Sequence, residues 1–170
     1  MKRTIIVLFA LFCFIGIKES NAQKFGHVNF NELYKQVPGH DAAQAEYEKY
    51  VAEIKQQIDA METELQQKYT EYSANSASMT PLIKTAKERE LQDLNARYED
   101  FRSSISADLS AKDSELSEPL ITKAKKAVED VAKENGYTYI FNSSDAAGTV
   151  LYAPPSDDVM DLVLKKLGVK

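Results

Sequence analysis

The sequence predicts a mainly α-helical protein in which a long antiparallel helical hairpin projects from a small, short-stranded β-body that mediates oligomerisation. Three observations lead to this fold class. Residues 41–135 are rich in Ala, Glu, Lys, Gln and Leu, show helical apolar spacing and contain one break. Short segments rich in aromatic and β-branched residues lie on either side, at 24–30 and 137–141. The remaining residues are too few to form a secure core by themselves.

The first 22 residues have the layout of a secretory signal peptide. Lys2 and Arg3 precede an apolar run of 13 residues, and Ser20 and Ala22 supply small residues before a cleavage site after Ala22. A run of this length is too short to span a bilayer as a stable helix, so a membrane anchor is the less favoured alternative. The single cysteine, Cys13, lies within this run. The exported chain therefore has no disulfide, and packing or assembly must stabilise it.

The charge balance argues against a nucleic-acid-binding protein. The full chain has 21 basic and 26 acidic residues and a net charge of −5. Cleavage of the signal peptide leaves 18 basic and 25 acidic residues, a net charge of −7. A nucleic-acid-binding domain would instead carry a basic face and a high isoelectric point.

The mature chain opens with a predicted strand at 24–30. A short helix is predicted next, at 32–36, with Asn29 or Asn31 as its N-cap. The Pro-Gly pair at 38–39 ends this helix, because such pairs interrupt helices and open turns.

The first long helix is predicted to begin at Asp41, as N-cap, and to end near Asn75. Its apolar residues follow alternating steps of four and three, the heptad spacing of a coiled-coil seam. These residues are Tyr47, Val51, Ile54, Ile58, Met61, Leu65 and Tyr72. The small, polar stretch 73–79 is predicted to form the tip of the hairpin. Thr80 as N-cap and Pro81 at the first helical position then begin the second helix.

The second long helix is predicted to run from Pro81 to about Glu134 and to extend beyond its partner at the C-terminal end. Its apolar residues keep the heptad spacing as far as Ile105 and are 11 apart afterwards, a period that does not support a left-handed supercoil. Pro119 predicts a bend. Because the two helices differ in length, residues 116–131 must pack on another part of the chain.

The C-terminal segment is predicted to supply that partner. It contains a strand at 137–141, a second strand at 149–153 and a last helix that Ser156 caps. We therefore divide the chain into a signal peptide (1–22), a hairpin (41–135) and a body that joins 23–40 to 136–170.

The predicted body is too small, and too apolar on both faces of its strands, to be stable alone. Oligomerisation through a shared β-body would bury the faces and the strand edges together. The residues that we expect in these oligomerisation strands are Phe25, Val28, Phe30, Tyr139, Phe141, Val150 and Tyr152.

No residue pattern in the chain indicates catalysis or a cofactor. His27 and His40 are 13 residues apart without a nearby cysteine, which disfavours a metal site. There is no glycine-rich phosphate loop or nucleophile motif. The many carboxylates are typical of solvated helix faces. We therefore expect a protein that is not an enzyme.

The order of these segments resembles that of the Skp/OmpH family of periplasmic chaperones. The resemblance covers the mature chain and is most specific at 118–142, which reads EPLITKAKKAVEDVAKENGYTYIFN. It implies a periplasmic homotrimer with a small β-barrel-like body and three helical tentacles. In that family the tentacles enclose a cavity that holds unfolded outer-membrane proteins without ATP. Better-known members have basic tentacles, whereas this chain is acidic, so contact with membranes or lipopolysaccharide stays open.

The predicted function is therefore that of an ATP-independent holdase for unfolded outer-membrane proteins. The alternative is a non-catalytic coiled-coil scaffold of the cell envelope. Tyr69, Tyr72 and Met79 near the tip are the candidate client contacts, because amphipathic rings and adaptable methionines suit contact with many different chains.

Overall fold

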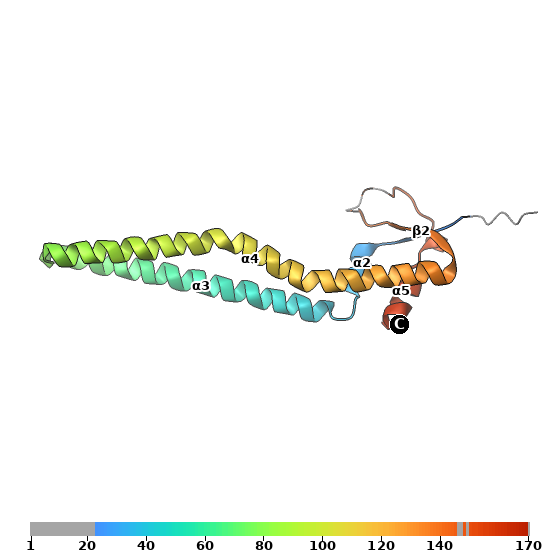
Figure 1. The fold of residues 1–170 in the computed structure, drawn as a ribbon, viewed down its shortest axis with the longest axis horizontal. Helices are drawn as coiled ribbons and strands as arrows, with labels where there is room; N and C mark the ends of the chain where they lie inside the picture. The colour runs from blue at the N-terminus through green and yellow to red at the C-terminus, as the bar shows by residue number, and fades with distance from the viewer. Residues whose placement is uncertain (1–22, 146–147, 149, 170) are drawn as a thin grey trace, which may run out of the picture.

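The computed structural model describes residues 23–145, 148 and 150–169. The predicted signal peptide and its cleavage site after Ala22 lie outside the described residues. The elements in chain order are β1 (Lys24–Val28), α2 (Phe30–Lys35), α3 (His40–Asn75), α4 (Pro81–Asn135), β2 (Tyr137–Asn142) and α5 (Met160–Leu167), with 3-10 turns at Ser76–Ser78 and Pro155–Asp157. Figure 1 shows a long hairpin of α3 and α4 with all other labelled elements gathered at one end. The predicted fold class is confirmed.

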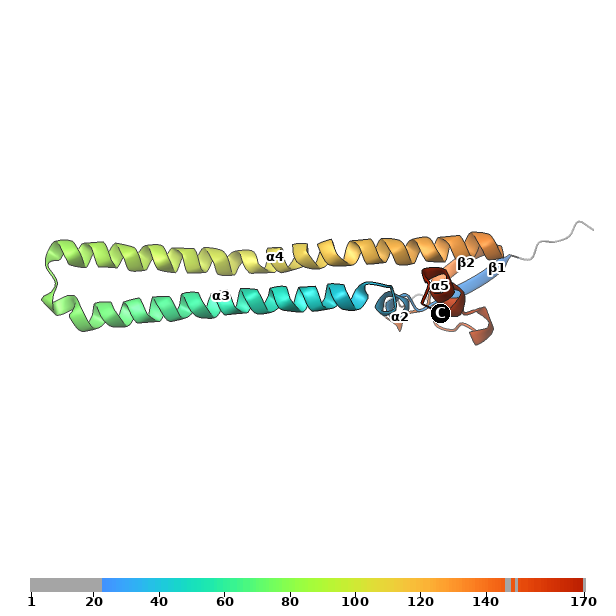
Figure 2. The same cartoon turned by 90° about the horizontal axis from the view of Figure 1, so that it is seen from below.

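The hairpin begins one residue earlier than predicted. Gly39 precedes α3 with φ 105°, a left-handed conformation that suits glycine, and Asp41 lies in the first helical turn instead of capping it. At the tip, the Thr80 hydroxyl accepts a hydrogen bond from the Ile83 amide, and Pro81 follows at the first position of α4. The predicted start of the second helix is thus confirmed. The helices α3 and α4 lie side by side in both views (Figures 1 and 2).

The longer helix, α4, stays helical through Pro119 and ends at Gly136, whose φ of 71° forms the C-cap. Figure 1 shows α4 changing direction along its yellow section, before its orange section reaches the body. One side of this orange section forms the main wall of the core, with Leu120, Ala124, Ala127 and Val131 buried. The prediction that the excess length of this helix packs on other parts of the chain is confirmed.

The opposite wall of this core comes from both ends of the chain. Val28, Leu33 and Val37 contribute from the N-terminal segment, and Val159 and Val163 contribute from α5 and the residue before it. Apolar side chains that are far apart in sequence are therefore removed from water together, which is the main source of stability for this end of the molecule.

For the short helices, Asn29 is confirmed as the first N-cap, whereas the predicted start of that helix and the cap of the last helix differ from the structure. The first short helix begins at Phe30 because the Asn29 side chain accepts bonds from the amides of Asn31 and Glu32. Phe30 is consequently helical and does not belong to the strand predicted at 24–30. Ser156 lies in a 3-10 turn and does not cap α5; the Asp158 carboxylate accepts from the Met160 amide at 2.8 Å instead.

The sheet contains two parallel strands, β1 and β2, in the described part of the chain. Phe25 lies opposite Tyr139, with a register shift between Lys24 and Phe25. The strand predicted at 149–153 is wrong for residues 150–153, which form no strand, while Thr149 lies outside the described residues. The residue types favour a strand there, but neither β1 nor β2 pairs with this segment.

Candidate functional site

The hairpin of α3 and α4, which we call the arm, buries few side chains between its two helices. No residue of α3 is fully buried, and only Leu91, Leu94 and Tyr98 of α4 are buried along the length that lies beside it. The predicted seam residues of α3 are half-buried, apart from Val51, which is 38% exposed. Apolar packing between two helices alone therefore leaves much of the seam in contact with solvent.

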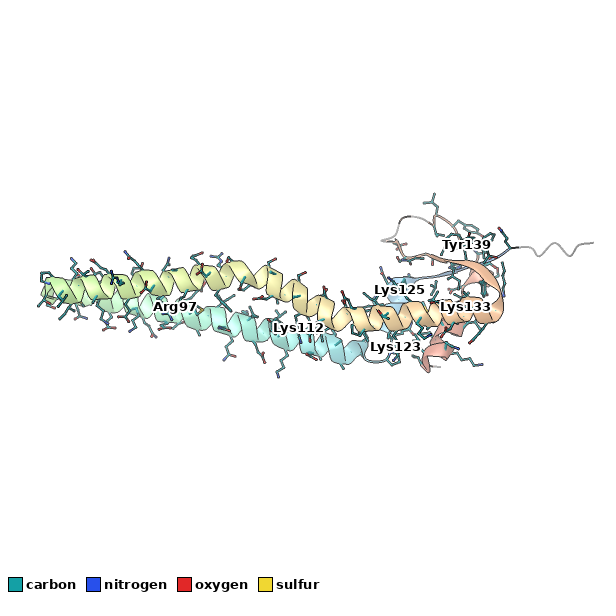
Figure 3. The ribbon with its side chains drawn as sticks, viewed as in Figure 1. Arg97, Lys112, Lys123, Lys125, Lys133 and Tyr139 are labelled. Carbon is teal, nitrogen blue, oxygen red and sulfur yellow. The ribbon has the colours of Figure 1, made fainter. Side chains whose placement is uncertain are left out.

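Hydrogen bonds and an ion pair between α3 and α4 supplement this limited apolar packing. The hydroxyls of Tyr98 and Tyr72 donate to the carboxylates of Glu62 and Glu88, each at 2.5 Å. These hydrogen bonds to a negative group raise the pKa of both tyrosines. Nearer the body, Lys112 of α4 reaches Glu46 of α3 at 2.7 Å (Figure 3).

A charged cluster of Glu90, Lys68 and Lys87 lies near the tip, beside Tyr72. Glu90 contacts Lys68 of α3 at 2.8 Å and Lys87 of its own helix at 2.9 Å. Hydrogen bonds and charge attraction from these two ammonium groups, Lys68 first, lower the pKa of Glu90 to about 2. The Lys68–Glu90 pair of this cluster links α3 to α4 near the tip.

The three predicted client contacts lie in different environments. Tyr69 is 46% exposed. Tyr72 and Met79 are half-buried and line the same small space, closed by Leu91 and Lys87. Tyr69 is therefore directly accessible to a bound chain, whereas Tyr72 and Met79 mainly hold the end of the hairpin together.

The most exposed apolar side chain of the arm was missed by the sequence analysis. Leu82 is 82% exposed and its neighbour Ile83 is 49% exposed, both in the first turn of α4. The heptad spacing extended back from Leu91 passes through Lys87 and Lys84 and skips both residues. That mismatch is the signal that could have identified them.

At the other end of the molecule, three aromatic rings form one open face of the sheet. Phe25, Tyr139 and Phe141 are 44%, 58% and 44% exposed, and their ring centroids lie 6.0–6.2 Å apart. Tyr139 lies among the strands at the end of the body (Figure 3). We call these three residues the aromatic face.

The opposite side of the strands packs on the core. A Cβ atom at Gly26 would lie only 2.9 Å from Val159 Cγ1, so glycine is required by this close approach. Val28, which we predicted as an oligomerisation residue, is 3% exposed and belongs to the core of its own chain.

The other predicted oligomerisation residues are spread over different elements. Phe30 packs against the core from α2. Val150 is half-buried and Tyr152 is 82% exposed, next to Leu151 at 97%. The structure thus brings three of the seven residues together on the aromatic face. Leu151 and Tyr152 form a second segment of exposed apolar side chains.

Both histidines have structural partners. The ring of His27 bridges the Ser143 hydroxyl at 3.2 Å and the Pro154 carbonyl at 3.0 Å, which ties β1 to the segments after β2. His40 is the first residue of α3 and packs edge-on against the Tyr34 ring.

The residues that the structure describes contain no group of three or more His, Cys, Asp or Glu side chains that could hold a metal ion. Within the same residues, no helix is both long and apolar enough to cross a membrane.

Comparison with known proteins identifies the architecture. Residues 24–167 match the family model described as outer membrane protein (OmpH-like). Chaperone protein Skp from Yersinia enterocolitica is 23% identical over 86% of this chain and 87% of its own length. Skp from Photorhabdus laumondii subsp. laumondii is 24% identical, with 86% of each chain covered. A solved OmpH-like outer membrane chaperone from Caulobacter crescentus shares the fold with a TM-score of 0.73, at 12% identity over 89% of this chain and 88% of its own. Because the family model spans residues 24–167 of the 170 in the chain, the protein belongs to the OmpH-like family.

Proposed function

We propose that this protein is an ATP-independent periplasmic holdase that binds unfolded outer-membrane proteins and prevents their aggregation. The observation that carries the proposal is that few side chains are buried between the two helices of the arm. Because two helices cannot bury all of their apolar groups, Tyr69, Leu82 and Ile83 stay at the surface of the arm. Such dispersed apolar groups suit many weak contacts with an extended chain. Relatives named as Skp chaperones support the same function.

In this proposal the body, residues 23–40 and 136–170, joins three chains, and the hairpin 41–135 of each chain is one wall of a cage. The aromatic face supports the assembly, since soluble monomers seldom leave three clustered aromatic rings open to water. The edge of β2 away from β1 has no strand partner in the described part of the chain, and open strand edges are templates for pairing with another chain.

Tyr69, Leu82 and Ile83 are the proposed client contacts of the arm. Tyr72 and Met79, which we also proposed from the sequence, act through the shape of the tip, because the Tyr72 hydroxyl is committed to Glu88. The predicted signal peptide, cleaved after Ala22, would bring the chain to the periplasm, where unfolded outer-membrane proteins pass.

The proposal is tested by diluting a urea-unfolded outer-membrane protein into buffer with this protein, without nucleotide, and following light scattering. A holdase suppresses the scattering at close to one trimer per client. A coiled-coil scaffold of the envelope, the alternative function, leaves the scattering unchanged at any ratio.

A further inference from the structure

A groove runs along the side of the arm where Tyr98 of α4 meets α3. It has a volume of about 640 Å³, and Glu62, Leu65, Gln66, Tyr69 and Tyr98 are among the residues that line it. Glu62 and Tyr69 are about 10 Å apart along the helix axis at 1.5 Å per residue. This length matches roughly three residues of an extended polypeptide, which rises about 3.3 Å per residue.

The groove offers both apolar and amide surface. Leu65 is half-buried and Tyr69 is 46% exposed, so each presents apolar atoms to an occupant. The side-chain amide nitrogen of Gln66 makes a long contact to the Thr70 hydroxyl at 3.4 Å, and its side-chain oxygen, Oε1, remains as an acceptor. An extended chain, with its regular backbone N–H groups, fits these partners.

Negative charge lies in the wall of the groove. The Glu62 carboxylate accepts one hydrogen bond, from Tyr98, and a carboxylate can accept several. Asp59 is exposed, lies one turn away on the same side of the helix and forms no ion pair with the residues that the structure describes. The cations nearest by position are Lys55, one turn before Asp59, Lys68, next to Tyr69, and Arg97 and Arg102 of α4, of which Arg102 acts on Tyr98 by its charge.

The charge of the whole helix has the same sign. The sequence of α3 contains eight acidic and three basic residues. One of the three basic residues, Lys68, is already paired with Glu90. The groove therefore lies in a region of net negative potential, which attracts positive and repels negative occupants.

We propose that this groove binds short extended segments of unfolded polypeptide in which a lysine or arginine lies beside an aromatic or aliphatic residue. The apolar side chain packs on Leu65 and Tyr69, and the cation lies against Glu62 and Asp59. This inference rests on the proposed chaperone function and names the chemistry of the client segments. Each exposed ion pair contributes little, so binding at one groove is weak and readily reversed.

The test places a photo-crosslinking benzoylphenylalanine at Gln66, with Glu64 on the other side of α3 as the matched control position. The probes are two fluorescent, unstructured peptides with the same Phe and Leu residues, one carrying Lys and the other Glu. At position 66 the Lys peptide should be labelled about tenfold more than the Glu peptide at low salt, and salt should reduce the difference. Equal labelling of both peptides, or equal labelling from positions 64 and 66, would overturn the proposal.

A double substitution, Asp59→Asn with Glu62→Gln, removes the two negative charges of the groove and so tests their role in binding separately from that of the apolar residues. Glutamine keeps an acceptor for the Tyr98 hydroxyl and Asp59 is exposed, so the arm should keep the circular-dichroism spectrum of the parent. The expected result is that labelling of the Lys peptide falls to the level of the Glu peptide, and an unchanged preference contradicts the inference. Suppression of client aggregation is measured separately: if it persists without peptide preference, only this inference fails.

Discussion

The aromatic face gives the sharpest quantitative prediction about assembly. Tyr139 is 58% exposed in the single chain. A tyrosine has on the order of 200 Å² of surface to bury, so about 120 Å² of Tyr139 is open to water. Covering this area at about 25 cal/mol per Å² contributes at most ~3 kcal/mol per chain, or about 9 kcal/mol for three chains. Replacing Tyr139 by serine should therefore weaken the trimer by up to roughly a million-fold in its dissociation constant.

The assay is sedimentation equilibrium over a range of protein concentrations. The parent should sediment as a trimer, and Tyr139→Ser should dissociate to monomers that stay helical, because Tyr139 lies outside the core. Tyr69→Ser is the matched control, since Tyr69 is 46% exposed but lies on the arm. If Tyr139→Ser keeps the trimer mass at every concentration, the aromatic face is not the interface.

Three further predictions concern the body, the charged cluster and the tip. Gly26→Ala should lower the free energy of unfolding in urea by about 1–3 kcal/mol, because its Cβ would press on Val159, whereas Thr138→Ala on exposed β2 surface should have little effect. An equal effect of the two substitutions would refute the close packing at Gly26. The pKa of Glu90 is lowered to about 2 from 4.5, so its contribution to stability is complete above pH 4.5 and is lost as the pH falls toward 2. The difference in melting temperature between the parent and Glu90→Gln should accordingly shrink across this interval, and a difference that stays constant would contradict the ion-pair account. Replacing Leu82 and Ile83 by serine should reduce the suppression of client aggregation several-fold without lowering the melting temperature, because both side chains are exposed. Ala77→Ser at the exposed tip is the control, and full activity of the double variant would remove the first turn of α4 from the client surface.

The long helices could be predicted because their signals are local. Heptad spacing depends only on residues three and four apart, and Thr80-Pro81 and Gly136 mark helix ends by their own backbone preferences. Both ends of α4 accordingly agree with the prediction within one residue. The start of α3 was misplaced because Asp41 is a good N-cap, while the left-handed conformation of Gly39 allows the helix to begin earlier.

The strands were harder to predict because their pairing is not local. Simple alternation places Tyr137, Tyr139 and Phe141 on the same side of β2. The register shift at the start of the sheet instead leaves Tyr137 against the core and the other two rings in the open. Residues 150–153 favour a strand by composition, yet a strand needs a partner edge, and a single sequence does not show which edge is available.

The candidate client surface was predicted only in part for a related reason. Tyr69 and Tyr72 were predicted from their residue type and their position near the tip, but neither property determines how exposed a side chain is. Tyr72 reaches the Glu88 carboxylate across the hairpin, a contact between residues 16 apart that the spacing does not show. Leu82 and Ile83 were overlooked because they lie off the seam, and for that same reason no helix covers them.

The measurement that tests the central claim most directly is native mass spectrometry of this protein mixed with an unfolded outer-membrane protein in the absence of nucleotide. A cage of three arms predicts a complex with the mass of three chains and one client. A client bound to a single chain, or the absence of any client complex at concentrations where the client would otherwise aggregate, would contradict the account.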